Sequence, residues 1–223
     1  MTRAGREGEE QQVSSEAKQH WESRYGERDR IWSGRVNARL AEVAAELPPG
    51  RALDLGCGEG ADALWLAERG WQVVGVDISE TALSRAAAEA KARGLADRVR
   101  FVPMNLSDDF PDGAFDLVSA QFLHSMVHLD RDRIFTRAAR AVAPGGTLLI
   151  VDHGAAPPWA AAAVHDHVFN SADEVAGALD LGAGRWERVY VGSVERDAVG
   201  PDGQTAVLTD NVIVLRRAAA TLA

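Results

Sequence analysis

A glycine-rich segment flanked by carboxylates is the part of this chain whose residue types and spacing best suit chemistry. It reads Asp54-Leu55-Gly56-Cys57-Gly58-Glu59-Gly60 and lies at the end of a short apolar run. Glycines at these positions let a backbone turn sharply and come close to a ligand at the carboxyl end of a sheet. A tight turn without a ligand is the alternative interpretation, so other residues must support a binding role.

A second carboxylate, Asp77, ends the next apolar run, VVGVD. It stands where a ribose-binding acid is expected, and a carboxylate accepts two hydrogen bonds, which matches the paired 2′ and 3′ hydroxyls of a ribose. Capping of the following helix is its alternative role. The spacing disfavours a dinucleotide, because G-x-G-x-x-G counted from Gly56 needs a third glycine where this chain has Ala61.

The elements that must position these residues form an alternating series. Apolar runs of strand length are Ala52–Leu55, Val73–Asp77, Val99–Val102, Phe115–Ala120 and Thr147–Asp152. Segments of helical periodicity separate most of them, with Ser79 and Asp130 as predicted N-caps. Strands separated by helices require right-handed crossovers and a parallel sheet. Two β-rich runs, 186–196 and 205–217, flank Pro201-Asp202-Gly203 and predict a terminal hairpin.

Composition limits the class of protein. The chain has 223 residues, 46% hydrophobic and 26% charged, which suits one α/β domain. No apolar run approaches the roughly 20 residues of a transmembrane helix, so no membrane partner is expected. Cys57 is the one cysteine, which favours a cytoplasmic location. A net charge of −9 argues against nucleic acid as a partner.

Four segments together resemble the successive motifs of class I S-adenosylmethionine (SAM)-dependent methyltransferases. They are LDLGCGEG, VVGVD, FVPMNLSDDFPDGAFDLVSAQFLHSM and APGGTLLI, within Ala52–Val151. The resemblance implies an α/β, Rossmann-like fold with a mostly parallel seven-stranded sheet, a C-terminal antiparallel hairpin and helices on both faces. It also implies SAM as the cofactor and a small-molecule substrate.

The resemblance assigns places along SAM to individual residues. Asp54 would lie near the methionine amino group, and Asp77 would hold the ribose. The other residues placed against the cofactor are Gly56, Cys57, Gly58, Ile78, Asn105, Leu106 and Gln121. Asn105 and Leu106 would edge the adenine, where the family more often carries an aspartate at the first position. The asparagine carbonyl can still accept from the adenine amino group, as a neutral and weaker partner.

The two ends of the chain resemble a narrower group. HWESRYGERDRIWSGRVNARL and the final hairpin are similar to small bacterial tellurite-resistance enzymes and thiol S-methyltransferases. By that resemblance Arg24 would pair with the methionine carboxylate, and Tyr25 and Trp32 would close over the site. Alternatively, Trp21 and Tyr25 attach a helix to the body.

One methyltransferase domain is expected over residues 13–217, after a flexible tail over residues 1–12. It divides into N-terminal lid helices (13–47), a cofactor-binding half (50–152), and a substrate-side segment with the hairpin (153–217).

Methyl transfer from a sulfonium needs little from the protein beyond proximity and alignment, since the donor is already activated. A base is needed only where the nucleophile arrives protonated, and a thiol with a pKa of about 8.5 needs little help. His124, in QFLHSM after the fourth strand, is the candidate base, because imidazole titrates near neutrality. A purely structural role in its loop is the alternative.

Further histidines lie between the fifth strand and the hairpin, where this fold builds its substrate pocket. His153, His165 and His167 are therefore candidates for substrate contact. His165-Asp166-His167 is not expected to bind a metal, because residues two apart point away from each other on a helix and no further ligand stands at suitable spacing.

The preferred function is S-methylation of a small molecule, a thiol or a disulfide, as in natural-product biosynthesis. If the acceptor were a disulfide, its methylated sulfur would acidify the neighbouring C–H, and His124 could remove that proton on the way to a thioacetal. O- or N-methylation of a metabolite and a non-catalytic SAM-binding domain are the alternatives. The oligomeric state cannot be predicted.

Overall fold

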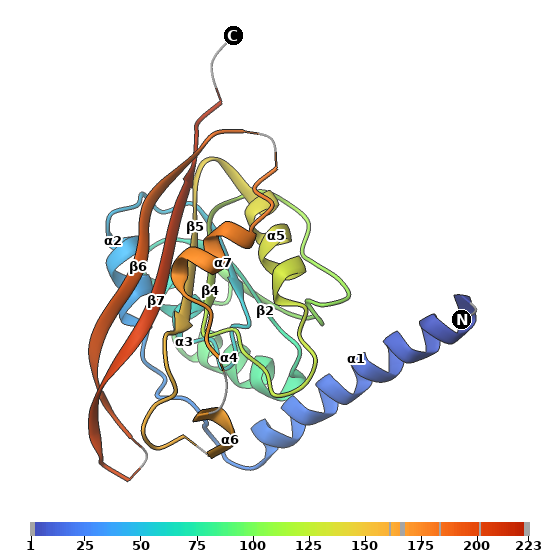
Figure 1. Cartoon of the computed structure of the whole chain (residues 1–223). Coiled ribbons are helices and arrows are strands. Elements are labelled where there is room, and N and C mark those ends of the chain that lie inside the picture. Colours follow the sequence, from blue (N-terminus) through green and yellow to red (C-terminus); the bar gives the residue numbers. More distant parts are fainter. Residues whose placement is uncertain (1–2, 161, 166–167, 183, 201, 221–223) are drawn as a thin grey trace.

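A seven-stranded sheet forms the centre of the molecule, with strand order β3-β2-β1-β4-β5-β7-β6 (Figure 1). The structure is a computed structural model that describes residues 3–160, 162–165, 168–182, 184–200 and 202–220. The strands are β1 (Arg51–Leu55), β2 (Gln72–Asp77), β3 (Val99–Pro103), β4 (Phe115–Gln121), β5 (Val142–His153), β6 (Trp186–Val199) and β7 (Thr205–Arg217). Strands β1 to β5 pair in parallel, whereas β7 runs antiparallel to both β5 and β6.

The strand order reverses at β1, which pairs with β2 on one side and with β4 on the other. In open α/β sheets a ligand binds beyond the carboxyl ends of the strands at such a reversal. The glycine loop leaves β1 at this point, and Gln121 ends β4 beside it. The fold therefore brings the predicted cofactor residues to one edge of the sheet.

The helices follow signals present in the sequence. They are α1 (Arg3–Gly26), α2 (Ala38–Ala45), α3 (Ala61–Glu68), α4 (Glu80–Ala92), α5 (Arg131–Ala141), α6 (Ala162–His165) and α7 (Ala172–Ala178). As predicted, Ser79 caps α4, since its hydroxyl accepts from the Ala82 amide at 3.1 Å. Asp130 likewise caps α5, accepting from the Arg133 amide at 3.2 Å.

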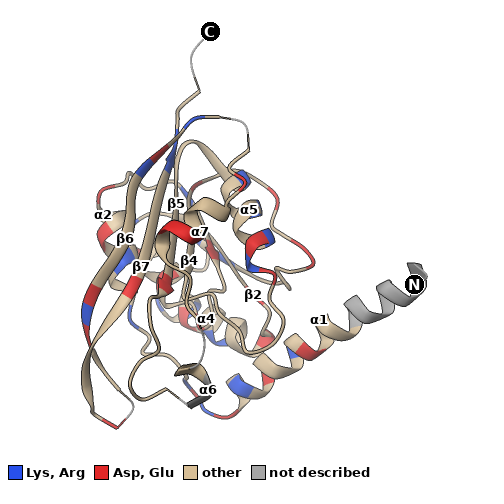
Figure 2. Cartoon of the chain, viewed as in Figure 1, with Lys and Arg blue, Asp and Glu red and all other residues tan. Residues whose placement is uncertain are grey.

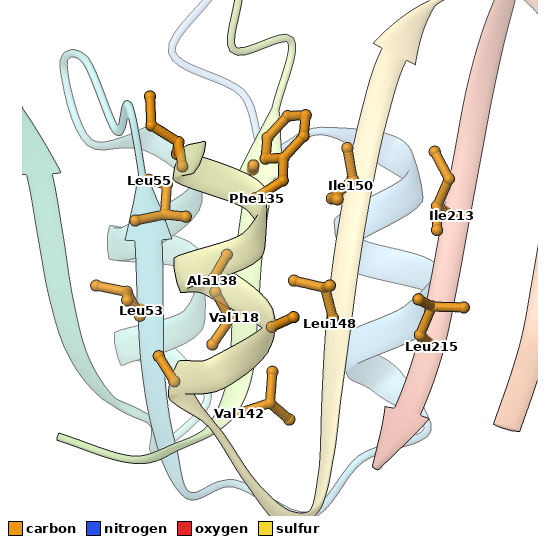
Figure 3. Packing of buried hydrophobic residues seen from close by; sticks show 14 of the residues in the cluster. Leu53, Leu55, Val118, Phe135, Ala138, Val142, Leu148, Ile150, Ile213 and Leu215 are labelled. Carbon is orange, nitrogen blue, oxygen red and sulfur yellow. The ribbon is translucent and has the colours of Figure 1, made fainter. Parts of the chain in front are cut away.

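Helices cover both faces of the sheet, because the inner strands carry apolar side chains on both faces. Leu148 and Ile150 of β5 pack with α5 and α7 in one cluster, and Figure 3 shows Phe135 and Ala138 of α5 facing these strands. Leu149 and Val151 point to the opposite face and pack with α2, α3 and α4. Burial of each such side chain contributes about 1.5–3 kcal/mol. The predicted fold class is confirmed.

The N-terminal segment differs from the sequence-based expectation of a flexible tail followed by a short helix from Ser14. A single helix, α1, begins at Arg3 and continues to Gly26, and its first half projects away from the body (Figure 1). No proline interrupts residues 3–13, which include good helix formers such as glutamate and glutamine. The helix therefore extends over most of the predicted tail.

The fifth strand also begins earlier than predicted. Pro144-Gly145-Gly146 ends the helix, as expected, but lies within β5, which starts at Val142 rather than at Thr147. Val142 pairs with Phe115, and the register shifts before Leu117 pairs with Thr147. The irregularity accommodates the proline, which cannot donate to a strand ladder.

Acidic and basic residues are interspersed along the strands and helices in the view of Figure 2. In the described part of the chain, no helix is both long enough and apolar enough to cross a membrane.

Candidate active site

The glycine loop passes very close to other parts of the chain. Gly58 has a φ of +52°, and a Cβ there would lie 2.8 Å from the Tyr25 hydroxyl. At Gly56, with a φ of +69°, a Cβ would lie 2.5 Å from the Leu123 side chain. Only glycine combines these dihedral angles with such approaches. The loop is thus built as a narrow backbone cradle at the end of β1.

Asp77 joins the ends of β1 and β2. Its carboxylate accepts hydrogen bonds from the Gly58 amide and the Ser79 amide, each at 2.9 Å. Burial raises the pKa of this carboxyl above its ordinary value, and these backbone hydrogen bonds oppose the rise. Each carboxylate oxygen has a further lone pair, so Asp77 can hold the loop and still accept from two ribose hydroxyls.

Two buried oxygens beside the loop have no hydrogen-bond partner among the described residues: Asp54 Oδ2 and Gln121 Oε1. Asp54 on β1 is 2% exposed, and Gln121 ends the neighbouring strand, where its Nε2 donates to Ser119 Oγ at 2.9 Å. Burial raises the pKa of Asp54, and Asp62 and Asp77 raise it further. A ligand that supplies an ammonium group would satisfy both oxygens, so these residues fit the amino-acid end of SAM.

The residues predicted at the adenine edge already have protein partners. Asn105 Oδ1 accepts from the Ser107 amide at 3.1 Å, and its Nδ2 donates to Ser14 Oγ at 2.9 Å and to Asp108 Oδ2 at 2.8 Å. Leu106 is buried in the apolar cluster around α5. The adenine role of both residues remains a prediction, and Asn105 also contacts α1.

The N-terminal segment lies over the glycine loop. Trp32 Nε1 donates to the Tyr25 hydroxyl at 2.9 Å, and Tyr25 is only 3% exposed. Glu59 of the loop accepts from the Ile31 and Trp32 amides at 3.2 and 3.1 Å. Arg85 of α4 then pairs with Glu59 at 3.0 Å and donates to the Tyr25 carbonyl at 2.8 Å. Glu59 and Arg85 hold this segment in place, a role that the sequence analysis did not assign to them.

Glu22 fastens α1 to the start of α4. Its carboxylate accepts from the Ser79 hydroxyl at 3.2 Å and from the Glu80 and Thr81 amides at 2.6 and 3.3 Å. Burial alone would raise the pKa of Glu22, but these hydrogen bonds lower it below its ordinary value. A carboxylate interacts favourably with the positive N-terminal end of a helix. The sequence could not have predicted this contact, because it shows only an acidic residue within a helical segment.

The structure also places Trp21 and three further predicted cofactor residues: Arg24, Ile78 and Cys57. Trp21 Nε1 donates to Ser125 Oγ at 3.3 Å, which ties α1 to the loop after β4. Arg24 is exposed, with its guanidinium carbon 6.0 Å from the Trp21 ring centroid and 5.9 Å from that of Trp32. Ile78 is half-buried directly after Asp77. Burial raises the pKa of the Cys57 thiol well above its ordinary value, so the thiol stays protonated and packs rather than attacks.

His124 follows β4 at the same edge of the sheet, next to Leu123, whose side chain approaches Gly56. Phe122 has a φ of +51°, unusual for a bulky residue, and this turn precedes His124. His124 Nε2 lies 3.3 Å from Asp152 Oδ1, and the other oxygen of Asp152 pairs with Arg131. Burial would raise the pKa of Asp152, but His124 and Arg131 more than offset this, and its pKa is lowered.

His153 joins His124 in an aromatic cluster. Its ring stacks on Phe122 with centroids 4.5 Å apart and lies 5.4 Å from the His124 ring. Burial, followed by the charges of His124 and Arg196, lowers the pKa of His153 to about 4. His153 is therefore neutral at pH 7, next to the candidate base.

One of the remaining histidine candidates, His165, lies on α6. His165 is exposed, with Nε2 3.2 Å from the Ala160 carbonyl oxygen, and His167 lies outside the described residues. Within the described ranges, no group of three or more His, Cys, Asp or Glu side chains is placed to hold a metal ion.

The fold defines a Rossmann-like α/β protein whose glycine loop lies at the reversal point of the sheet. Residues 53–150 match the family model described as a methyltransferase domain. The demethylmenaquinone methyltransferase of Thermus thermophilus is 36% identical over 151 residues, 66% of this chain and 67% of that protein. The chain belongs to the class I SAM-dependent methyltransferases, so it is an enzyme with SAM as its cofactor.

Two further proteins are similar to this chain. Nocamycin O-methyltransferase of Saccharothrix syringae is 36% identical over 130 residues, which cover 55% of this chain and 44% of that protein. The second is a protein whose solved structure concerns the conversion of a disulfide bond into a thioacetal group during echinomycin biosynthesis. Its sequence is 28% identical to this chain. Its TM-score is 0.64, and the match covers 86% of this chain and 87% of the other.

Proposed function

We propose that this enzyme methylates sulfur in a small molecule, and that its acceptor is a disulfide which it converts into a thioacetal. The observation that carries the proposal is His124, a candidate base held against a buried carboxylate at the carboxyl edge of the sheet. The 28% identity to the echinomycin protein, over 86% of this chain, supports the same chemistry.

SAM supplies an activated methyl group when bound. Asp77 and the glycine loop would hold its ribose, and the unpartnered oxygens of Asp54 and Gln121 would receive its amino group. The N-terminal segment, fastened through Glu59 and Arg85, would keep water from the cofactor. These residues contribute alignment in a dry site, which can supply up to about 7–11 kcal/mol of the barrier.

The disulfide chemistry balances without an oxidant or a reductant. One sulfur of the acceptor gains the methyl group and becomes a sulfonium, which acidifies the C–H bond on its own carbon. His124 accepts that proton, the resulting carbanion bonds to the second sulfur, and the S–S bond breaks toward the methylated sulfur. The products are a neutral thioacetal, the demethylated cofactor and one proton.

The surroundings of His124 suit an uncharged acceptor. The rings of Phe122, His153 and Phe169 gather around it, with the His124 and Phe169 centroids 6.3 Å apart. Both nearby arginines are paired, Arg131 with Asp152 and Arg196 with Asp210. Aromatic faces and neutralised charges favour an apolar ligand over an ionic one.

The test uses the purified enzyme with SAM and a panel of cyclic peptide disulfides and the corresponding thiols. Mass spectrometry should show that the disulfide gains the mass of one CH2 group. When the carbon next to sulfur in the acceptor is labelled with deuterium, the product should have lost one deuteron. The variant His124→Asn should form thioacetal at least about 100-fold more slowly, the usual contribution of a general base.

His128→Asn is the matched control, because His128 is an exposed histidine in the same loop. It should keep the activity, and both variants should bind SAM normally in calorimetry. The proposal fails if no sulfur acceptor is methylated, or if His124→Asn turns over disulfides as fast as the unaltered enzyme.

O-methylation is the second candidate, favoured by the similarity to nocamycin O-methyltransferase. A hydroxyl nucleophile also requires a base, and His124 would take its proton. The same enzyme preparation, assayed with phenols and alcohols, decides between the two acceptors. Turnover of hydroxyls with none of the disulfides or thiols would establish the second candidate.

A further inference from the structure

We infer that Asp152, held by Arg131, is a positioning residue that fixes the ring of His124 with Nε2–H toward the carboxylate and the Nδ1 lone pair free for a proton. This inference rests on the proposed function, in which His124 removes a proton from the acceptor. It concerns side chains that lie far apart in the sequence and that no sequence motif connects.

The geometry carries the inference. His124 Nε2 and Asp152 Oδ1 are both buried and have no hydrogen-bond partner among the described residues, and they lie 3.3 Å from each other. Leaving a buried polar atom without a partner destabilises the folded state. Their separation is within hydrogen-bond range, so a hydrogen bond between these two atoms, formed by reorienting the imidazole, would satisfy both.

The tautomer follows from this contact. A neutral imidazole has one N–H and one lone pair, and the partner of one nitrogen sets the state of the other. A carboxylate is an acceptor only, so it selects the Nε2–H form. Nδ1 is then the nitrogen that can receive a proton from the acceptor.

Asp152 is itself rigidly held. Its side chain is 3% exposed, it is the last residue but one of β5, and its second oxygen pairs with Arg131 at the start of α5. The Arg131 guanidinium carbon lies 5.0 Å from the Phe135 ring centroid, which fixes the arginine against the core. The carboxylate therefore stays charged and in place while His124 changes its protonation state.

Stacking against His153 restricts the rotation of the His124 imidazole, because one face of the ring is covered. The two rings lie 20° from parallel with centroids 5.4 Å apart. A ring that is stacked on one side and bonded through one nitrogen has few orientations left. This is the condition for a base that must meet a C–H bond in one direction.

The first measurement is made on the unaltered enzyme, and a variant serves only to assign the signal. Nitrogen NMR of the histidine rings in the unaltered enzyme should show His124 as the Nε2–H tautomer in its neutral form. His124→Asn identifies the signal by its loss. If the neutral ring carries its proton on Nδ1, the inference is overturned, whatever the fate of any variant.

The second measurement is kinetic and uses Asp152→Asn. With a disulfide acceptor, kcat should fall about 100-fold while KM for SAM stays unchanged, because proton removal alone is affected. With an acidic thiol, which reacts as the thiolate, kcat should stay close to that of the unaltered enzyme. An equal loss with both acceptors would mean a general structural role and would overturn the inference.

Asp180→Asn is the control, since Asp180 also pairs with an arginine, Arg140, but lies outside the cluster around His124. It should retain the disulfide activity. In the double variant His124→Asn/Asp152→Asn, the second change should have no further effect, because both act on one step.

The outcomes separate the two proposals. If His124→Asn is harmless, the proposed proton removal fails, and the inference fails with it. If His124→Asn is slow and Asp152→Asn is not, the inference alone fails.

Discussion

Two parts of the carboxyl edge of the sheet, the proposed cofactor side and the proposed acceptor side, are held together by different kinds of contact. On the cofactor side, β1, β2 and the glycine loop are joined by backbone amides, as in the two bonds from Gly58 and Ser79 to Asp77. On the acceptor side, His124, Asp152 and Arg131 contact one another through side chains alone. These three come from the loop after β4, the end of β5 and the start of α5.

The difference shows how one fold can keep a cofactor and change its substrate. A site made of backbone amides depends on glycines and dihedral angles, and most substitutions there would damage it. A cluster of side chains at strand ends can be replaced while the sheet stays intact. The acceptor side is therefore where this chain can differ from relatives that share its cofactor.

The largest effect in this comparison is expected from Asp77→Ala. The substitution removes the acceptor of two backbone amides and of the proposed ribose contacts, and bonds to a charged group contribute about 1.5–3 kcal/mol each. SAM affinity should fall at least about 100-fold in calorimetry. The acceptor cluster around His124 should keep its histidine NMR signals, because Asp77 does not contact it.

Asp77→Asn is the companion variant, since it retains one oxygen for a backbone amide. Its loss of SAM affinity should be smaller than that of Asp77→Ala. Equal affinity in Asp77→Ala and the unaltered enzyme would show that the ribose is held elsewhere.

The proximity of the residues on the proposed cofactor side could be predicted from the sequence because the information is local. The glycine loop, Asp77 and the cap at Ser79 all lie within one strand–helix–strand–helix segment, and the structure places them together. For Asp152 and Arg131 the sequence predicted only that the first ends a strand and the second begins a helix. Their meeting depends on the β4–β5 pairing and on how α5 packs, which a local pattern does not contain.

The N-terminal segment is an intermediate case. Tyr25 and Trp32 lie beside the glycine loop, and their role as a lid stays a prediction, whereas the length of α1 did not follow from the residues. The contacts that fasten it, through Glu22, Glu59 and Arg85, join residues far apart in the chain. Charged side chains with many alternative partners give no sequence signal for one particular pair.

The next effect concerns stability on the acceptor side. The pKa of His153 is about 4 in the folded protein and about 6.5 when unfolded, so the unfolded state binds the proton more tightly. The stabilisation is present above about pH 6.5 and is lost as the pH falls toward 4. Between pH 7 and pH 5 the free energy of unfolding should fall by about 1–2 kcal/mol from this residue, after allowance for its partial exposure.

His153→Phe isolates that contribution, since it keeps a ring stacked on Phe122 and removes the titration. Urea unfolding at pH 7 and pH 5 should show a smaller pH-dependent loss in the variant than in the unaltered enzyme. An identical loss in both proteins would mean that His153 is protonated in the folded state.

The smallest effect is expected at Asn105, where the cofactor side departs from its family. Asn105→Asp would supply the charged acceptor more common at this position, but its new carboxylate would face Asp108, whose oxygen now lies 2.8 Å from Asn105 Nδ2. Repulsion between the two acids would cancel most of the gain, so SAM affinity should change less than about threefold.

The double variant Asn105→Asp/Asp108→Asn exchanges the two groups and restores a donor at position 108. It should bind SAM about fivefold more tightly, roughly 1 kcal/mol, if the adenine amino group lies at residue 105. Should calorimetry find no gain, Asn105 serves α1 through Ser14 instead, and the adenine is held by other residues.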